Sequence, residues 1–274
     1  MKQSQAKKRD NAMTNKILMG LIALVLGLLF LEILIVHSKN EQQKNASNQV
    51  QTARIMANGD LLYHDGLYMS ALQADGSYDF TENFTYVKPW LKQADLVLGD
   101  FEGTINPDYP LSGYPLFNAP QSVTAAIKDA GYDVMDLAHN HILDSGLEGA
   151  FTTADAFKKV GIDPIGVYEK PVRDKAPLLI KNVNGIKVAI LSYAYGYNGL
   201  ESNLTDKEVA DHLSNLDEKR MKAEIQRAEK EADITVIMPQ MGVEYRLEPT
   251  DEQVKLYHKM IDWGADIIFG GHPH

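Results

Sequence analysis

Five short apolar runs, each followed directly by polar residues, restrict the fold of this chain more than any other feature of its sequence. The polar segment after the third run is the densest, because two histidines, an asparagine and an aspartate fall within residues 139–144. In open α/β sheets, ligands bind beyond the carboxyl ends of the parallel strands, where the strand tips meet. We therefore expect the polar segments to converge on one shared site. They are residues 58–60, 99–102, 139–144, 239–244 and 270–274.

Strand-like and helix-like segments alternate from residue 52 onward. Strands ending near residues 58, 98 and 137 alternate with helices expected around 84–93, around 121–130 and from Leu147. The last of these helices has apolar residues at three- and four-residue spacing, which is the amphipathic pattern. This alternation favours a layered α/β fold.

Two turn and cap signals add detail to this prediction. Apolar runs flank Asn184 and Gly185, the strongest short hairpin signal, so we expect an antiparallel pair within residues 177–195. Charged helices are expected over 216–232 and 250–263, and Thr250 and Gln253 have capping-box spacing. Most of the second half of the chain is thereby assigned to strands and helices.

The N-terminal region contains an apolar segment, 17–36, of about 20 residues, which is long enough to span a bilayer. Five Lys or Arg residues and one acidic residue precede it, so the positive-inside tendency places the short tail in the cytoplasm. A cleaved signal peptide is the alternative, but it would have a shorter apolar core followed by small residues. We predict a single-pass anchor in the cell membrane and an extracytoplasmic C-terminal domain. The predicted parts are a basic tail (1–16), the anchor (17–36), a flexible linker (37–51) and the domain (52–274).

The charge of the chain limits the function classes. The formal net charge is −10, and the part beyond the basic tail has 22 basic and 36 acidic residues. Such an acidic domain argues against nucleic-acid binding. A polyanionic substrate would need a bound cation or a local basic pocket. The absence of cysteine excludes disulfides and thiolate metal sites.

The polar segments supply the ligand types of a divalent-metal site. Carboxylate, amide and imidazole groups together suit Mn²⁺, Fe or Zn²⁺, and two such ions about 3.5–4 Å apart can clamp a phosphate. Some of these residues also have a purely structural explanation. Asp60 would suit a turn or a helix cap, and Asp144 directly precedes Ser145 and Glu148, which have capping-box spacing. The candidate donors are Asp60, Glu102, Asn140, His141, His272 and His274.

The motifs resemble those of the CapA (PgsA) capsule-synthesis proteins, whose ectodomain is related to the calcineurin-like metallophosphoesterases. The resemblance rests on residues 58–60, 94–103, 140–146, 242–245 and 270–274, and it extends from about Arg54 to the last residue. It implies a four-layer α/β/β/α metallophosphoesterase-like sandwich with the metal site at the strand ends. It also implies that Asp60, Glu102, Asn140, His272 and His274 are metal ligands, and that His141 handles protons.

The chain departs from the family pattern in two places. Gln240 stands where many relatives carry a histidine, and a neutral amide binds these ions less well, so the second metal position is disfavoured. Relatives also continue past the His-Pro-His motif, so we expect the sandwich to be incomplete at its C-terminal end. Gln240, Glu244 and Asp144 are further candidate site residues.

Three functions follow from these observations. The resemblance implies an anchored accessory protein for synthesis, export or attachment of an anionic surface polymer such as poly-γ-glutamate, with membrane proteins of a synthase complex as partners. The first alternative is an extracytoplasmic metallophosphoesterase that acts on wall- or lipid-linked phosphates. The second is a metal-free binding or assembly module.

Overall fold

The computed structural model describes residues 19, 31–39, 50–172 and 175–273. The chain divides into two units, Met1–Gln51 and Thr52–His274. Residues 31–39 of the first unit are helical. Within the described ranges, no helix is both long and apolar enough to cross a membrane. Most of the expected anchor, 17–36, lies outside these ranges, and the anchor stays a prediction.

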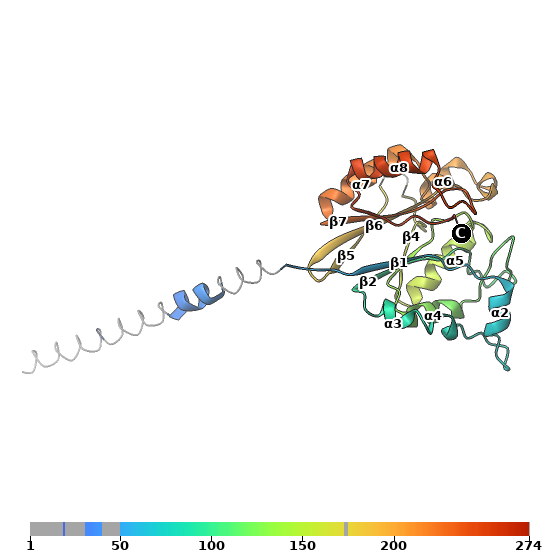
Figure 1. Ribbon diagram of the computed structural model, residues 1–274, viewed down its shortest axis with the longest axis horizontal. Coiled ribbons are helices and arrows are strands. Elements are labelled where there is room, and N and C mark those ends of the chain that lie inside the picture. Colours follow the sequence, from blue (N-terminus) through green and yellow to red (C-terminus); the bar gives the residue numbers. More distant parts are fainter. Residues whose placement is uncertain (1–18, 20–30, 40–49, 173–174, 274) are drawn as a thin grey trace, which may run out of the picture. The chain divides into compact units, whose positions relative to one another are not determined.

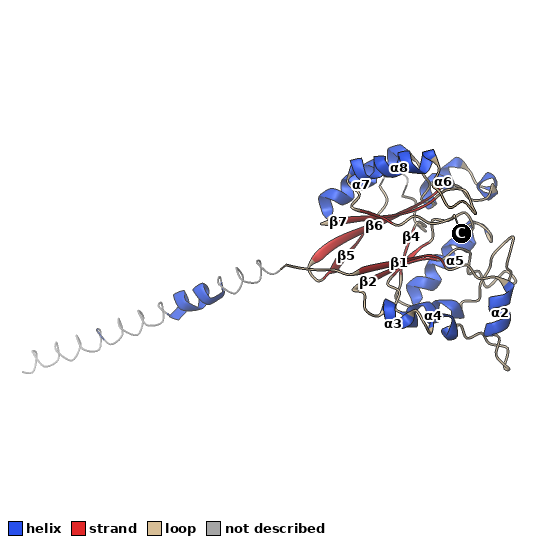
Figure 2. Ribbon diagram, in the orientation of Figure 1, coloured by secondary structure: helices blue, strands red, loops and turns tan. Residues whose placement is uncertain are grey.

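The second unit contains two four-stranded sheets (Figures 1 and 2). All pairs of the first sheet are parallel, in the order β1-β2-β3-β4. In the second sheet, in the order β5-β6-β7-β8, only the β5–β6 pair is antiparallel. The expected α/β class with parallel strands is confirmed. The strands are β1 (Ile55–Asp60), β2 (Leu96–Asp100), β3 (Val134–Asp136), β4 (Asp163–Ile165), β5 (Leu179–Val183), β6 (Ile186–Ala194), β7 (Ile234–Gln240) and β8 (Ile267–Ile268).

Helices cover the outer faces of the two sheets (Figure 2). One apolar cluster joins the first sheet to its helices, a second lies between the sheets, and a third joins the second sheet to α7 and α8. The second cluster shows that the sheets pack face to face, because it contains Leu98 from β2 and Val236 from β7. The helices are α2 (Asp65–Ala71), α3 (Lys88–Leu91), α4 (Ser122–Ala130), α5 (Gly146–Lys159), α6 (Asp206–His212), α7 (Glu218–Glu231) and α8 (Asp251–Trp263), with short 3₁₀ turns at Thr81–Phe84 and Leu200–Asn203.

Several local predictions are confirmed. The β5–β6 hairpin turns at Asn184 and Gly185, whose φ angles are 54° and 91°. These positive values suit Asn-Gly, which tolerates the left-handed region. Thr250 and Gln253 form the expected capping box of α8. The amphipathic pattern of α5 is real, since Phe157 is fully buried.

Two local predictions are only partly right. Ser145 is the N-cap residue of α5, but no capping box forms, and its buried hydroxyl donates to Thr104 Oγ1 at 2.8 Å. The helix expected around 84–93 is shorter than predicted, since α3 covers Lys88–Leu91 and a 3₁₀ turn at Thr81–Phe84 precedes it. Pro89 explains the second difference, because proline is tolerated in the first turn of a helix but not in its interior.

Candidate functional site

Strand register aligns three aspartates at the carboxyl ends of the first sheet. Asp60 of β1 pairs with Asp100 of β2, and Asp100 pairs with Asp136 of β3. Asp100 and Asp136 are buried. Of these three aspartates, only Asp60 is among the residues predicted from the sequence. The rule that sites form at strand ends would have found them, because each is the last residue of its strand.

Glu102, two residues beyond β2, completes the group, which we call the acid cluster: Asp60, Asp100, Glu102 and Asp136. Both carboxyl oxygens of Glu102 and Oδ1 of Asp100 are buried without a hydrogen-bond partner among the described residues. Within the same part of the chain, no Lys or Arg forms an ion pair with Asp100, Glu102 or Asp136. Buried carboxylates without a counter-charge are unusual, because removing their hydration is costly.

This environment raises the pKa values of Asp100, Glu102 and Asp136. Burial, followed by the charge of Asp60, raises the pKa of Glu102 to about 9. Burial likewise raises the pKa of Asp136 to about 8. Burial and then the charge of Asp136 raise the pKa of Asp100 well above its ordinary value. A cation in this cluster would compete with protons for these carboxyl groups.

His141 lies beside the acid cluster and is held in place from several directions. Its Nδ1 is 2.7 Å from Asp144 Oδ2, and its Nε2 is 3.8 Å from Glu102 Oε1. The Phe117 ring stands edge-on to the imidazole, with ring centres 4.7 Å apart. The imidazole is buried, so its orientation is fixed by these contacts. The structure thus places His141, Asp144 and Glu102 of the predicted site together.

Asn140 and Gln240 form a pair of amides on the other side of the site. The backbone N–H of Asn140 donates to Gln240 Oε1 at 2.8 Å, and Gln240 Nε2 donates to Asn140 Oδ1 at 3.0 Å. Both residues are buried. Gln240 therefore contacts Asn140, and the amide oxygen that Asn140 would offer to a metal accepts a hydrogen bond instead.

The C-terminal segment contributes His272. This residue is buried, its φ of 94° is unusual for a non-glycine residue, and its ring centre is 4.7 Å from that of Tyr195. Glu244 is mostly exposed, with Oε1 4.0 Å from His272 Nε2. The predicted ligand His274 lies outside the described residues.

The donor chemistry of the acid cluster fits a divalent cation, because its unpaired oxygens are hard carboxylate donors. No set of three or more His, Cys, Asp or Glu side chains within the described ranges is already arranged around a metal-sized position. A bound cation would therefore have to draw the carboxyl groups together. The fit rests on the unpaired oxygens and not on a preformed coordination shell.

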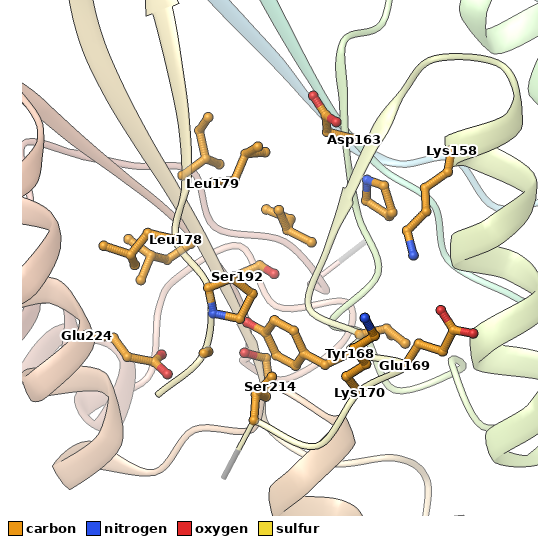
Figure 3. Close-up of a pocket in the computed structure, with 18 residues that line it drawn as sticks. Lys158, Asp163, Tyr168, Glu169, Lys170, Leu178, Leu179, Ser192, Ser214 and Glu224 are labelled. Atoms are coloured by element: carbon orange, nitrogen blue, oxygen red, sulfur yellow. The ribbon is translucent and has the colours of Figure 1, made fainter. Parts of the chain in front are cut away.

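A separate cavity of about 540 Å³ lies between β4 and the β5–β6 hairpin (Figure 3). Leu178 and Leu179 lie on one side of it, and Lys158 and Asp163 lie on the other. Its wall includes none of the predicted site residues. The strand-end site and this cavity are therefore distinct.

The fold resembles that of a solved protein. A putative 5′-nucleotidase from Staphylococcus aureus, crystallised in complex with alpha-ketoglutarate, superimposes with a TM-score of 0.52 at 16% sequence identity, over 81% of this chain and 46% of that one. The likeness concerns the fold alone. The domain is therefore an α/β protein whose fold resembles that of this solved protein, with an acid cluster and a histidine at its strand ends.

Sequence comparison defines the family. The family described as "Bacterial capsule synthesis protein PGA_cap" matches residues 54–274, and the chain belongs to this family. The capsule biosynthesis protein CapA of Bacillus anthracis is 33% identical over 200 residues, covering 70% of this chain and 48% of the relative. The PGA biosynthesis protein CapA of Bacillus subtilis (strain 168) is 28% identical over 270 residues, covering 97% of this chain and 69% of the relative. The chain thus spans about half the length of the first relative.

Proposed function

We propose that this protein is an accessory of capsule synthesis that engages an anionic surface polymer through a divalent cation at the acid cluster. Membership of the capsule synthesis family and the names of the Bacillus relatives support the pathway. The observation that carries the cation is that both carboxyl oxygens of Glu102 and Oδ1 of Asp100 are buried without a hydrogen-bond partner among the described residues, and that no Lys or Arg there forms an ion pair with them. Poly-γ-glutamate is the polymer that fits this proposal.

The acid cluster and His272 would hold the cation. When bound, a divalent cation supplies positive charge that a carboxylate or phosphate group can coordinate. The chain itself offers little positive charge to a polyanion, since its formal net charge is −10. The carboxyl groups would thus contribute to binding an acidic ligand indirectly, because they hold the cation whose positive charge neutralises that ligand.

Phosphoester hydrolysis is a second candidate, and the geometry of His141 favours it. Asp144 holds the Nδ1 edge of the imidazole at 2.7 Å, which leaves Nε2 directed toward the acid cluster. An imidazole oriented in this way can give a proton to a leaving group, as general acids do. Wall- or lipid-linked phosphates would be the substrates.

The location of the protein is proposed from its sequence. The apolar segment 17–36, with basic residues before it, supports a single-pass anchor in the cell membrane with the domain outside. Membrane proteins of a polymer synthase complex would be its partners. Such an arrangement would place the acid cluster where a surface polymer emerges.

The direct test is binding of poly-γ-glutamate by the full chain, purified in mild detergent, with Mn²⁺ or with a chelator. We expect binding in Mn²⁺ and its loss in the chelator, because the cation bridges two acidic partners. Glu102→Gln should weaken binding about ten-fold or more, since it removes one buried carboxylate. The exposed Glu169→Gln variant is the matched control and should bind like the wild type. Binding that persists unchanged in the chelator would favour the metal-free assembly module instead.

A further inference from the structure

We infer that the site binds one divalent cation at the acid cluster, which we call the carboxylate side of the site. The opposite, amide side is formed by Asn140 and Gln240, and Gln240 closes it to a second cation. This inference rests on the proposed cation and adds its number and position. It concerns two groups of donor atoms that the fold brings to the same strand ends. One group is hydrogen-bonded within itself, and the other includes Asp100, which lines a cavity and whose buried Oδ1 has no hydrogen-bond partner among the described residues.

The amide side is closed by a chain of hydrogen bonds whose directions are determined. The backbone N–H of Asn140 can only donate, so the Gln240 atom 2.8 Å away is its carbonyl oxygen. Gln240 Nε2 must then be the donor to Asn140 Oδ1, at 3.0 Å. Asn140 Nδ2 in turn donates to Asn198 Oδ1 at 3.2 Å. Both amide oxygens are therefore engaged, and a cation bound there would leave buried donors unpaired.

The carboxylate side is open. A cavity of about 320 Å³ between the ends of the two sheets is lined by Asp100 and Asp136, and it is also bordered by Gln240, whose side-chain amide is already hydrogen-bonded to Asn140. Asp100 is only 3% exposed, and its Oδ1 has no hydrogen-bond partner among the described residues. A buried acceptor beside a polar cavity is a position where a cation would remove an unfavourable interaction.

Gly271 shows where the oxygens converge. A Cβ atom added at this residue would lie 3.2 Å from Asp100 Oδ2 and 3.4 Å from Asp60 Oδ1. Carboxyl oxygens of two neighbouring strands therefore face the space above Gly271, which also lines the cavity. A glycine keeps this space free, and a cation placed there would be within reach of both carboxylates. A side chain introduced at position 271 would thus compete with the cation for this space.

The experiment measures Mn²⁺ bound to the full chain in mild detergent, by equilibrium dialysis with elemental analysis and by electron paramagnetic resonance. We expect one equivalent and the six-line spectrum of an isolated ion. Gly271→Ala should weaken Mn²⁺ binding at least ten-fold. Gly66→Ala is the matched control, because a Cβ at Gly66 meets nothing within 4 Å and Gly66 does not line the cavity. Gln240→His should raise the stoichiometry toward two, since it opens the amide side and adds an imidazole.

Each outcome bears on a different claim. Two equivalents in the wild type, with an exchange-coupled spectrum, would overturn the single-cation inference and leave the proposed cation intact. No bound Mn²⁺ in a folded wild type would overturn the proposed cation itself. Equal affinities for Gly271→Ala and Gly66→Ala would overturn the position, and an unchanged single equivalent in Gln240→His would overturn the role of Gln240. Asp100→Asn, which preserves volume, provides the same test of position if Gly271→Ala fails to fold.

Discussion

Asp144 connects two parts of the site through a single oxygen atom. Its Oδ2 accepts a hydrogen bond from the backbone N–H of Phe117 at 2.6 Å and lies 2.7 Å from His141 Nδ1. A helix-cap role is the structural explanation that the sequence suggests for this residue, but Asp144 instead holds the imidazole and the strand-end loop together. A carboxylate in this position fixes the orientation of the imidazole through its Nδ1 edge.

We predict that Asp144→Asn lowers any Mn²⁺-dependent hydrolysis of bis-p-nitrophenyl phosphate about 100-fold, with KM little changed. Asparagine can still accept from Phe117, but its neutral amide makes a weaker hydrogen bond to His141 Nδ1 than a carboxylate does, so the imidazole is held less firmly. His141→Ala should abolish hydrolysis while Mn²⁺ content stays the same. Exposed Asp108 provides the control as Asp108→Asn. Full turnover by Asp144→Asn would disprove the proton-transfer role of the pair.

At the scale of elements, the segment between β2 and α4 is organised around the buried side chain of Asn118. Its Oδ1 accepts from the backbone N–H of Asn106 at 2.7 Å, and its Nδ2 donates to the carbonyl oxygens of Asn106, Tyr109 and Pro110. The next residue back, Phe117, packs against His141. An irregular segment with this many internal hydrogen bonds can position a functional side chain as firmly as a strand does.

Asn118→Ala is expected to destabilise the protein by about 3 kcal/mol, because it leaves several buried polar groups without partners. Hydrogen exchange should show lost protection in residues 104–118, while the two sheets stay protected. Exposed Asn203 is the control, since Asn203→Ala removes an amide from the surface. Uniform loss of protection over both sheets would contradict a local role for Asn118.

For the whole molecule, the acid cluster makes folding dependent on pH. The pKa of Glu102 rises from 4.5 to about 9, and that of Asp136 from 3.8 to about 8. At a pH between the unfolded-state and folded-state pKa of each group, the folded chain holds a proton that the unfolded chain has released. The free energy of unfolding contributed by these groups is therefore largest at low pH and falls as pH rises through the folded-state values.

We predict that the metal-free protein melts at a lower temperature at about pH 8.5 than at about pH 5.5, as this proton balance requires. Mn²⁺ should raise Tm more at the higher pH, because protons compete with the cation for the same oxygens. Differential scanning calorimetry measures both effects. In Glu102→Gln the pH dependence should be smaller. A Tm that rises across this range in the metal-free protein would contradict the prediction.

The predicted anchor is testable in cells. The full chain should stay with the membrane through an alkaline wash, and deletion of residues 17–36 should release it, because that segment alone is long and apolar enough in the sequence to span a bilayer. Protease added to spheroplasts should digest the domain if it lies outside. A wild-type chain that is extracted by the wash would rule out the anchor.

The sequence by itself determined the features that depend on neighbours in the chain. The Asn184-Gly185 hairpin, the Thr250 capping box and the amphipathic α5 were predictable because turn chemistry, caps and helical periodicity are local. The rule for strand ends also located His141, Asp144, Glu102 and Gln240 in one site.

Only the tertiary structure decided how these residues meet. The row of Asp60, Asp100 and Asp136 depends on strand register, and the bonds between Asn140 and Gln240 join residues 100 positions apart. Ser145 bonds to Thr104 instead of capping its helix for the same reason. Register and packing are set by contacts between distant segments. The packing of the sheets therefore decides which donor atoms stay open for a cation and which form hydrogen bonds.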